Sequence, residues 1–344
     1  MHACEEEIIK SKNIHTQRQQ MRWWVFAAFV PLFFCGAAVV AENRKFQTLL
    51  FYTCVTPQVG NQCEEGFTLD QAGIVTRGFS SNFTTIERGW AQNITTFYAV
   101  HDVFFSNGKG LRKDWEQAWE ALQAKIDPFI RKGAIVGFFV GDELFPGKIT
   151  FEEFTTALKA IQETKVKYAD YNLLTWENEG GTGWIADFKG GIPTELDIIS
   201  MDDYYMWDDK THGPQSQVDG HRNWYVKNVY PLLKSHQTVF IVPGSFGTHD
   251  PSPPKKGYPF GNKTYCYNGT FEGCDAYMAD QANAYAQWAF EDQRVSGIAA
   301  WHWDTRKIGV VTPYKEIGVV DMKLTKDAWR AIGDKIKESG TADS

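Results

Sequence analysis

The sequence predicts an α/β protein of the (β/α)8, or TIM-barrel, class, built as a single domain after an N-terminal signal or anchor segment. The first observation is that eight segments rich in β-branched and aromatic residues follow one another along the chain. The second is that segments of helical periodicity separate several of them, which is typical of parallel βαβ units. The third is length: of the 344 residues, about 300 remain after the N-terminal segment, and this suits one barrel better than two average domains.

The first half of the expected barrel contains the clearest strand. The first three expected strands span residues 46–55, 73–79 and 93–105. Residues 113–132 then place apolar side chains at the three-and-four spacing of an amphipathic helix. The fourth strand, 134–144, is a nearly uncharged run of Val, Ile and Phe, typical of a strand covered on both faces, and it ends in two carboxylates. A helix follows from Thr150 to about residue 168, where Glu153 completes a capping box.

The second half repeats the alternation without an internal repeat or linker. The remaining strands are expected at 172–181, 196–205, 238–247 and 297–305. Helices are expected at 219–234, 275–295 and 325–338. A doubly wound open sheet is the alternative, because the first two strands have the weakest patterns. No glycine-rich phosphate-binding motif follows a strand, so we predict no cofactor.

The N-terminal residues 1–41 have the pattern of a targeting segment. An apolar run from Trp23 to Ala41 follows Arg22 and ends in small residues, as in a cleaved secretory signal. Met21 would begin a signal of ordinary length, and residues 42–344 would form the barrel domain. The alternative is an uncleaved type II membrane anchor, since 19 apolar residues nearly span a bilayer. We therefore expect a secreted or extracellular protein, or one anchored in the membrane of the secretory pathway.

Two other features agree with export. Glycosylation sequons begin at Asn82, Asn93, Asn262 and Asn268. Outside the leader the four cysteines form two close pairs, and the short spacing favours local disulfides among the three pairings that four cysteines allow. These pairs are Cys54 with Cys63 and Cys266 with Cys274. No zinc-type spacing of Cys and His occurs, so we predict no metal site.

Charge and aromatic content favour a sugar, rather than a nucleic acid, as the ligand. The net charge is −7 and the basic residues are scattered, so we predict no nucleic-acid partner. We predict no protein partner either. The 13 Trp, 14 Tyr and 24 Phe residues are frequent near strand ends, and flat rings with a polar edge suit sugar rings. The simpler explanation for any one of them is a place in the core.

Polar and aromatic residues collect at the predicted carboxyl ends of the strands, where barrel active sites lie. They are His101, Asp102, Asp142, Glu143, Trp176, Glu177, Glu179, Asp202, Asp203, Tyr204, Tyr205, Trp301, Trp303 and Asp304. Side chains alternate along a strand, so only one of Asp142 and Glu143 should face the barrel axis. We assign Glu143, which has the longer side chain, as proton donor, and expect Asp142 to accept hydrogen bonds from neighbouring loops. One of Trp301 and Trp303 should face the interior and the other the helices.

This set of residues suits glycoside hydrolysis. Carboxylates under aromatic walls have raised and divergent pKa values, so one stays protonated near neutral pH while another is ionised. One acid then protonates the leaving oxygen, and the other acts as nucleophile or base. Neighbouring strands lie about 4.8 Å apart, which places carboxyl groups at their ends within the roughly 5 to 10 Å that this chemistry uses. Strand-end acids also have an ordinary explanation as helix N-caps or loop residues.

The order of these residues resembles that of the (β/α)8 glycoside hydrolases in the broad cellulase-like superfamily. There, the acid/base Glu ends the fourth strand, a Tyr ends the sixth and a Trp of the eighth lies under the sugar. The matching residues here are, in the same order, Gly141-Asp142-Glu143, Tyr204 or Tyr205, and Trp301 or Trp303. The resemblance covers roughly residues 45 to 305 and implies carboxylate acid/base catalysis on a polysaccharide or glycan.

One departure concerns the second acid. The superfamily carries its nucleophilic Glu at the end of the seventh strand, where this chain reads Val242-Pro-Gly-Ser-Phe-Gly247. Either another acid takes that role, with Glu179 and Asp203 as the candidates, or the mechanism differs. Chitinase-like barrels offer a weaker resemblance, since they pair a fourth-strand Glu with a sixth-strand Tyr and acid, and the N-acetyl group of the substrate attacks. Their spaced aspartates before the Glu are replaced here by Val136, Phe139 and Gly141.

Three hypotheses follow. The first is an exported O-glycosidase whose substrate-binding residues are His101, Asp102, Asp142, Trp176, Tyr204, Tyr205, Trp301 and Trp303. The second is a non-catalytic carbohydrate-binding barrel, suggested by the missing seventh-strand Glu. The third, metal-dependent hydrolysis through Asp202, Asp203 and His101, lacks a recognisable ligand spacing.

Overall fold

The computed structural model describes most of the compact unit that spans Lys45–Ser344. The described residues are 46–52, 73–106, 110–146, 148–180, 188, 191–202, 213–249, 271–308 and 314–341. The predicted signal or anchor lies outside them, and so stays a prediction. Within these ranges, no helix combines the length and the apolar character needed to cross a membrane.

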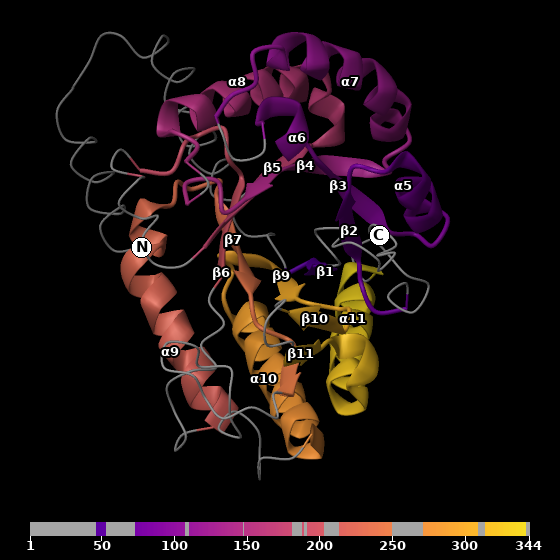
Figure 1. Cartoon of the computed structure of the whole chain (residues 1–344), viewed down its shortest axis with the longest axis vertical. Helices are drawn as coiled ribbons and strands as arrows, with labels where there is room; N and C mark the ends of the chain where they lie inside the picture. The colour runs from indigo at the N-terminus through magenta and orange to yellow at the C-terminus, as the bar shows by residue number, and fades with distance from the viewer. Residues whose placement is uncertain are drawn as a thin grey trace, which may run out of the picture. The chain divides into compact units, whose positions relative to one another are not determined.

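The main sheet is a nearly closed parallel barrel (Figure 1). Its eight strands are β1 (Thr48–Tyr52), β2 (Arg77–Ser80), β3 (Thr95–Ala99), β4 (Ile135–Asp142), β5 (Leu174–Gly180), β6 (Ile198–Asp202), β7 (Thr238–Val242) and β9 (Val295–Trp301). Neighbours follow chain order, and β9 pairs with β1. At the remaining gap, the Thr76 N–H donates to the Leu49 carbonyl at 3.0 Å, and Thr76 Oγ1 accepts from the Leu49 N–H at 2.9 Å. This arrangement confirms the predicted barrel and excludes the open sheet.

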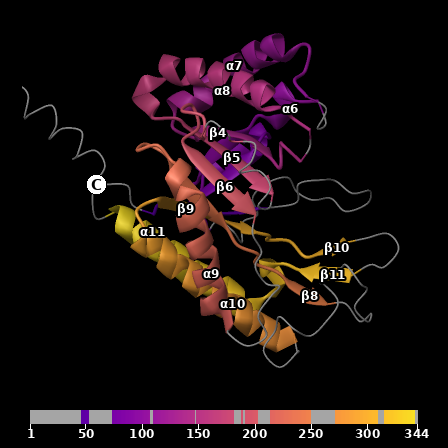
Figure 2. The ribbon, with the colours of Figure 1, turned by 90° about the vertical axis from the view of Figure 1, so that its left-hand side faces the viewer.

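Helices follow the strands and cover the outside of the barrel (Figures 1 and 2). The longer ones are α5 (Phe83–Trp90), α7 (Trp115–Arg131), α8 (Phe151–Lys167), α9 (Gly213–Asn228), α10 (Phe271–Glu291) and α11 (Lys323–Thr341). Short helical segments are α6 (His101–Phe104), η1 (Ala169–Tyr171), η3 (Tyr230–Leu232) and η5 (Val319–Asp321). The capping box of Thr150 and Glu153 at the start of α8 is present as predicted.

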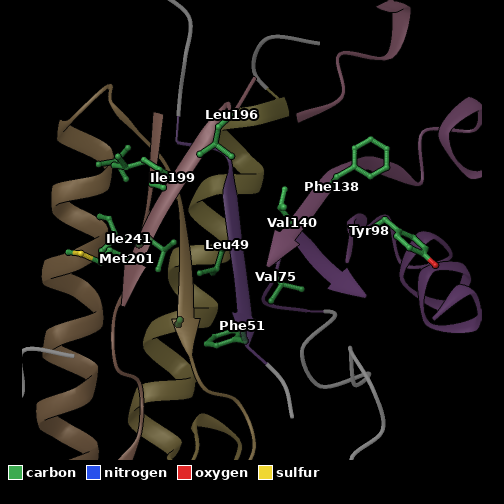
Figure 3. Close-up of a cluster of buried hydrophobic side chains, with 14 of the residues drawn as sticks. Leu49, Phe51, Val75, Tyr98, Phe138, Val140, Leu196, Ile199, Met201 and Ile241 are labelled. Atoms are coloured by element: carbon green, nitrogen blue, oxygen red, sulfur yellow. The ribbon is translucent and has the colours of Figure 1, made fainter. Parts of the chain in front are cut away.

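Alternation along the strands separates two layers of core. In β1, Leu49 and Phe51 pack outward against the helices, whereas Leu50 and Tyr52 point into the barrel. Figure 3 shows part of the outer layer, with Phe138 and Val140 of β4 among its side chains. The inner layer is built from Leu50, Tyr52, Phe97, Phe139, Trp176, Ile198, Phe240, Val242 and Ala299. The same alternation decides which side chains at each strand end face the barrel mouth.

Several elements differ from the expected ones. The third strand ends at Ala99 rather than at residue 105, because the chain turns into α6 and carries His101 and Asp102 out of the sheet. Helix α5 was not predicted, although Asn82 caps it by accepting from the N–H groups of Thr84 and Thr85. A three-stranded antiparallel sheet was also missed, because its strands are too short to show a period. It consists of β8 (Gly247–His249), β10 (Arg306–Ile308) and β11 (Tyr314–Ile317), which Figure 2 shows together.

Some predicted sites fall outside the described residues. The sequon residues Asn82 and Asn93 are exposed, and Asn93 lies in a turn with φ 60°. Asn262 and Asn268 are not among the described residues. Of the cysteines predicted to pair, only Cys274 is described, buried in α10, so both disulfide pairings stay predictions.

Candidate active site

Two carboxylates at the mouth of the barrel are held by one amide. The Asn178 Nδ2 of β5 donates to Asp142 Oδ1 at 2.6 Å and to Asp202 Oδ1 at 2.9 Å. Asn178 is fully buried, whereas the two aspartates at the ends of β4 and β6 are half-buried. The two oxygens share one nitrogen, so they lie no farther apart than the two bonds together, about 5.5 Å. The carboxyl ends of three neighbouring strands thus form one polar cluster.

A buried chain of hydrogen bonds fixes the orientation of this amide. Trp176 Nε1 donates to Ser200 Oγ at 2.7 Å, and Ser200 Oγ donates to Asn178 Oδ1 at 2.7 Å. The indole N–H can only donate, so Ser200 accepts it and directs its own hydrogen at the Asn178 oxygen. The amide NH2 group must then face Asp142 and Asp202. Buried hydrogen bonds therefore fix the orientation of the Asn178 amide without a bound ligand.

A β-bulge brings Asp142 to the mouth. In the pairing of β4 with β5, Phe139 faces Trp176, and Asp142 faces Asn178, so three steps on β4 match two on β5. The extra residue shifts the alternation, which would otherwise have turned Asp142 outward. Asp142 consequently accepts its hydrogen bond from a side chain of the neighbouring strand. The expectation that simple alternation would send Asp142 away from the axis is therefore wrong.

Glu143 reaches the same mouth through a left-handed backbone conformation. Its φ is 49°, and its N–H donates to the Asn178 carbonyl at 2.9 Å. A non-glycine residue in a sparsely populated conformation costs on the order of 1 kcal/mol, and such residues cluster at functional sites. The exposed carboxyl group of Glu143 occupies the space on the inward side of Gly180, where a Cβ would overlap with it. Two consecutive acids thus lie at the same barrel mouth.

The environment of Asp142 raises its pKa above the ordinary value of an aspartate. Burial raises the pKa of Asp142 to about 6, the nearby charge of Glu143 acts in the same direction, and the hydrogen bond from Asn178 opposes them. His101 lies beside Gly141 and lowers the pKa of Asp142 slightly by its charge. The His101 Nδ1 lies 3.1 Å from Asp102 Oδ1, and the Asp102 side chain is 90% exposed. His101 therefore flanks the cluster, and Asp102 points to solvent.

Aromatic rings form a floor under the acids. Tyr52 packs against Phe79 at 5.1 Å and against Trp301 at 5.2 Å between ring centroids, and Phe139 lies 4.3 Å from Trp176. Trp301 is half-buried, so part of its ring is accessible, whereas Trp176 is completely covered. Trp176 consequently acts on the cluster only through Ser200. The accessible aromatic surface of the floor is that of Trp301 and Phe79.

Two predicted residues lie on the outer side of the barrel wall. Trp303 is fully buried in the outer layer, where its ring centroid lies 5.2 Å from that of Phe51, and the Phe51 ring lies 5.8 Å from that of Trp329. Glu179 is also fully buried and accepts a hydrogen bond from the Phe145 N–H at 3.1 Å. Neither side chain faces the mouth. Asp203, Tyr204 and Tyr205 lie outside the described residues, so their predicted roles are untested.

Glu179 forms a buried carboxyl pair with Glu177. Burial, followed by the charge of Glu179, raises the pKa of Glu177 well above its ordinary value. Burial also raises the pKa of Glu179 to about 7, against hydrogen bonds from Glu177 and from the N–H groups of Phe145 and Leu144. Leu144 and Phe145 directly follow Glu143. The pair therefore anchors the segment that holds Glu143 at the mouth.

Asn178 and Ser200 were not among the residues predicted from the sequence. Alternation was the signal that could have found Asn178: once Trp176 is placed inside the barrel, Asn178 follows on the same side, and Glu177 and Glu179 face outward. Ser200 and Asp202 share a face of β6 for the same reason. Across the described ranges, no group of three or more His, Cys, Asp or Glu side chains is placed to hold a metal ion.

The packing of Glu143 on Gly180 gives a first prediction. We expect Gly180→Ala to lower the activity of the site by about 10- to 100-fold, because a new Cβ displaces the Glu143 carboxyl group and small misplacements are costly in catalysis. Thermal unfolding should change little, since Glu143 can move into solvent. The matched control is Gly220→Ala in α9, where a Cβ meets no atom within 4 Å. Unchanged activity of Gly180→Ala would contradict the placement of Glu143.

Comparisons with known proteins identify no family for this chain. No protein-family model matches it, and no curated protein matches it. A solved GH113 β-1,4-mannanase is 13% identical with a TM-score of 0.43, and the match covers 87% of this chain and 92% of that one.

Two β-glucuronidase structures are also similar. The enzyme from Ruminococcus gnavus is 12% identical with a TM-score of 0.46, over 77% of this chain and 44% of that one. The enzyme from Bifidobacterium dentium, complexed with coumarin-3-O-glucuronide, is 10% identical with a TM-score of 0.49, over 83% of this chain and 46% of that one. The chain thus spans less than half of either glucuronidase.

Proposed function

We propose that this protein is a secreted glycoside hydrolase that cleaves O-glycosidic bonds of a polysaccharide or glycan, with Glu143 as proton donor. One observation carries the proposal: Asp142, Glu143 and Asp202 meet at the carboxyl end of a barrel, above an aromatic floor. This end is where barrel enzymes place their active sites. Paired carboxylates in unequal environments are the requirement of glycosidic bond hydrolysis.

The roles follow from exposure and reach. Glu143 is exposed at the edge of the mouth, so its carboxyl group can reach the leaving oxygen of a bound glycoside. Half-buried Trp301 offers a flat ring for the C–H face of a sugar, which is a common use of aromatic side chains with one accessible face. His101 and Asp142 supply polar contacts for hydroxyl groups beside it. The proton donor and the sugar platform thus lie on different strands around one opening.

Export belongs to the same proposal. The apolar N-terminal segment would direct the chain into the secretory pathway, either cleaved or retained as an anchor. The exposed sequon residues Asn82 and Asn93 would be accessible to glycosylation there, and the oxidising compartment would allow the two predicted disulfides. Expression in a eukaryotic secretory system, with glycosidase digestion and non-reducing mass analysis of the product, tests these points.

The test of the activity is hydrolysis of defined glycans by the full chain. We expect release of reducing ends from at least one substrate in a panel of β-mannan, xylan, cellulose, chitin and aryl glycosides. The same glycans are assayed for binding on an array. If no glycan of the panel is bound and none is hydrolysed, the proposal is contradicted.

The second candidate function is carbohydrate binding without catalysis. It is favoured by the end of β7, where the chain reads Pro243-Gly-Ser-Phe246 and offers no carboxylate. Binding on the array with no release from any bound glycan would support this function and exclude hydrolysis.

A further inference from the structure

We infer that Asp202 is the catalytic nucleophile and that the reaction proceeds with retention of configuration. The inference rests on the proposed function and answers which acid acts with Glu143. The sequence pointed to Glu179 or Asp203 for this role. Glu179 is buried on the outer side of β5, where it bonds the Phe145 N–H, so it does not face a substrate at the mouth.

Alternation along β6 places Asp202 inside the mouth. Ile198 belongs to the inner core layer, and Ser200 bonds the inward-facing Trp176 and Asn178. Asp202 is two residues further along, on the same face, and its Oδ1 receives the Asn178 N–H. Asp202 is half-buried, so part of the residue is exposed to solvent.

Glu143 and Asp202 face each other across a glycine. Gly180 of β5 pairs with Asp202 of β6, and the Glu143 carboxyl group fills the space on the inward side of Gly180. Neighbouring strands lie about 4.8 Å apart, so a carboxyl group placed over Gly180 can approach the carboxyl group of Asp202 to roughly 5 Å, the spacing that retaining enzymes use. A side chain at position 180 would close this gap.

Asp142 is less suited to the nucleophilic role, although Asn178 also holds it. It precedes Glu143 directly, so the two acids approach a bound sugar from the same edge of the mouth. A nucleophile must attack the face of the anomeric carbon opposite to the leaving group that Glu143 protonates. Asp202 stands on the far side of β5 and meets this requirement.

Asn178 prepares Asp202 for attack. A hydrogen bond donated to a carboxylate favours its ionised form, which is the nucleophilic one. The amide cannot rotate away, because its oxygen is fixed by Ser200 and its other N–H by Asp142. Asn178 is thus a positioning residue for the nucleophile.

The two steps of the reaction balance. An ionised Asp202 oxygen bonds to the anomeric carbon while the glycosidic C–O bond breaks, and the Glu143 proton passes to the leaving oxygen to give an alcohol. Glu143, now a carboxylate, removes a proton from water. The resulting hydroxide oxygen bonds to the anomeric carbon, and the bond to Asp202 breaks and restores its carboxylate.

The experiment uses the full chain and an aryl glycoside of the sugar released in the substrate panel. We expect Asp202→Ala to lower turnover by at least about 10³-fold. Azide should restore turnover of Asp202→Ala and give a glycosyl azide of the opposite anomeric configuration. With Glu143→Ala, azide should give a glycosyl azide of the same configuration as the substrate.

Two further measurements decide between the acids. An activated 2-deoxy-2-fluoro glycoside should label the wild-type peptide that contains Asp202, and NMR should show a first product with retained configuration. The exposed Asp170→Asn substitution is the matched control and should change neither rate nor product. A label on Asp142, an inverted first product, or near wild-type turnover by Asp202→Ala would overturn the inference while leaving glycoside hydrolysis intact. Wild-type protein without turnover would instead remove the proposed function, and this inference with it.

Discussion

Replacing Glu143 by Gln is expected to lower kcat for glycoside hydrolysis by about 10²- to 10⁴-fold, the range of a lost general acid. The amide has nearly the shape of the carboxyl group, but it carries no acidic proton that could pass to the leaving oxygen. Glu143 is exposed, so the free energy of unfolding should be unchanged. Steady-state kinetics on a natural glycan, together with thermal unfolding, measures both quantities.

Leaving-group dependence distinguishes a lost proton donor from general damage to the site. An aryl glycoside with a very acidic phenol needs no protonation of its leaving oxygen, so the loss of bond-cleavage rate in Glu143→Gln should be much smaller for it. The matched control is Glu163→Gln, on the exposed surface of α8, which should behave as wild type. Equal losses for both leaving groups, or no loss for either, would exclude Glu143 as the proton donor.

The barrel could be predicted because its determinants are local patterns. The strand at 134–144 shows an apolar run covered on both faces, and its observed bounds are Ile135–Asp142. The capping box at Thr150 marks the start of α8 within one residue. The predicted strand ends were less accurate than the predicted strands. The third strand stops at Ala99 because α6 begins two residues later, and no periodicity in the sequence marks that change.

The candidate site was predicted in place but not in detail. The carboxyl ends of parallel strands must share one mouth, so Asp142, Glu143 and Trp301 could be gathered from sequence alone. The bulge in β4 and the left-handed Glu143 are decided by pairing with β5, and no pattern in β4 shows them. Glu179 was expected at the mouth because it lies at the end of the fifth expected strand, but alternation along β5 turns it outward, where it is buried. Its raised pKa makes this burial less costly, since a protonated carboxyl group carries no charge.

The buried pair Glu177 and Glu179 is expected to make the protein less stable as pH rises. Both pKa values are raised in the folded state, so the pair contributes its full stability below the ordinary value of 4.5. That contribution is lost as pH rises through about 7 for Glu179 and through a higher range for Glu177. A shift of this size for Glu179 corresponds to on the order of 3 kcal/mol. Urea unfolding between pH 5 and pH 9 measures this loss.

Glu177→Gln identifies the source of that loss. The amide keeps the shape of the side chain and can donate to Glu179 as the protonated acid does, but it has no proton to lose. We expect the variant to be more stable than wild type at pH 8 and to show a smaller decline of unfolding free energy with pH. Glu163→Gln is again the control and should follow the wild-type curve. Parallel pH curves for Glu177→Gln and wild type would show that this pair does not govern the decline. Because Glu179 bonds the segment after Glu143, glycoside hydrolysis in Glu177→Gln should also persist to higher pH than in wild type.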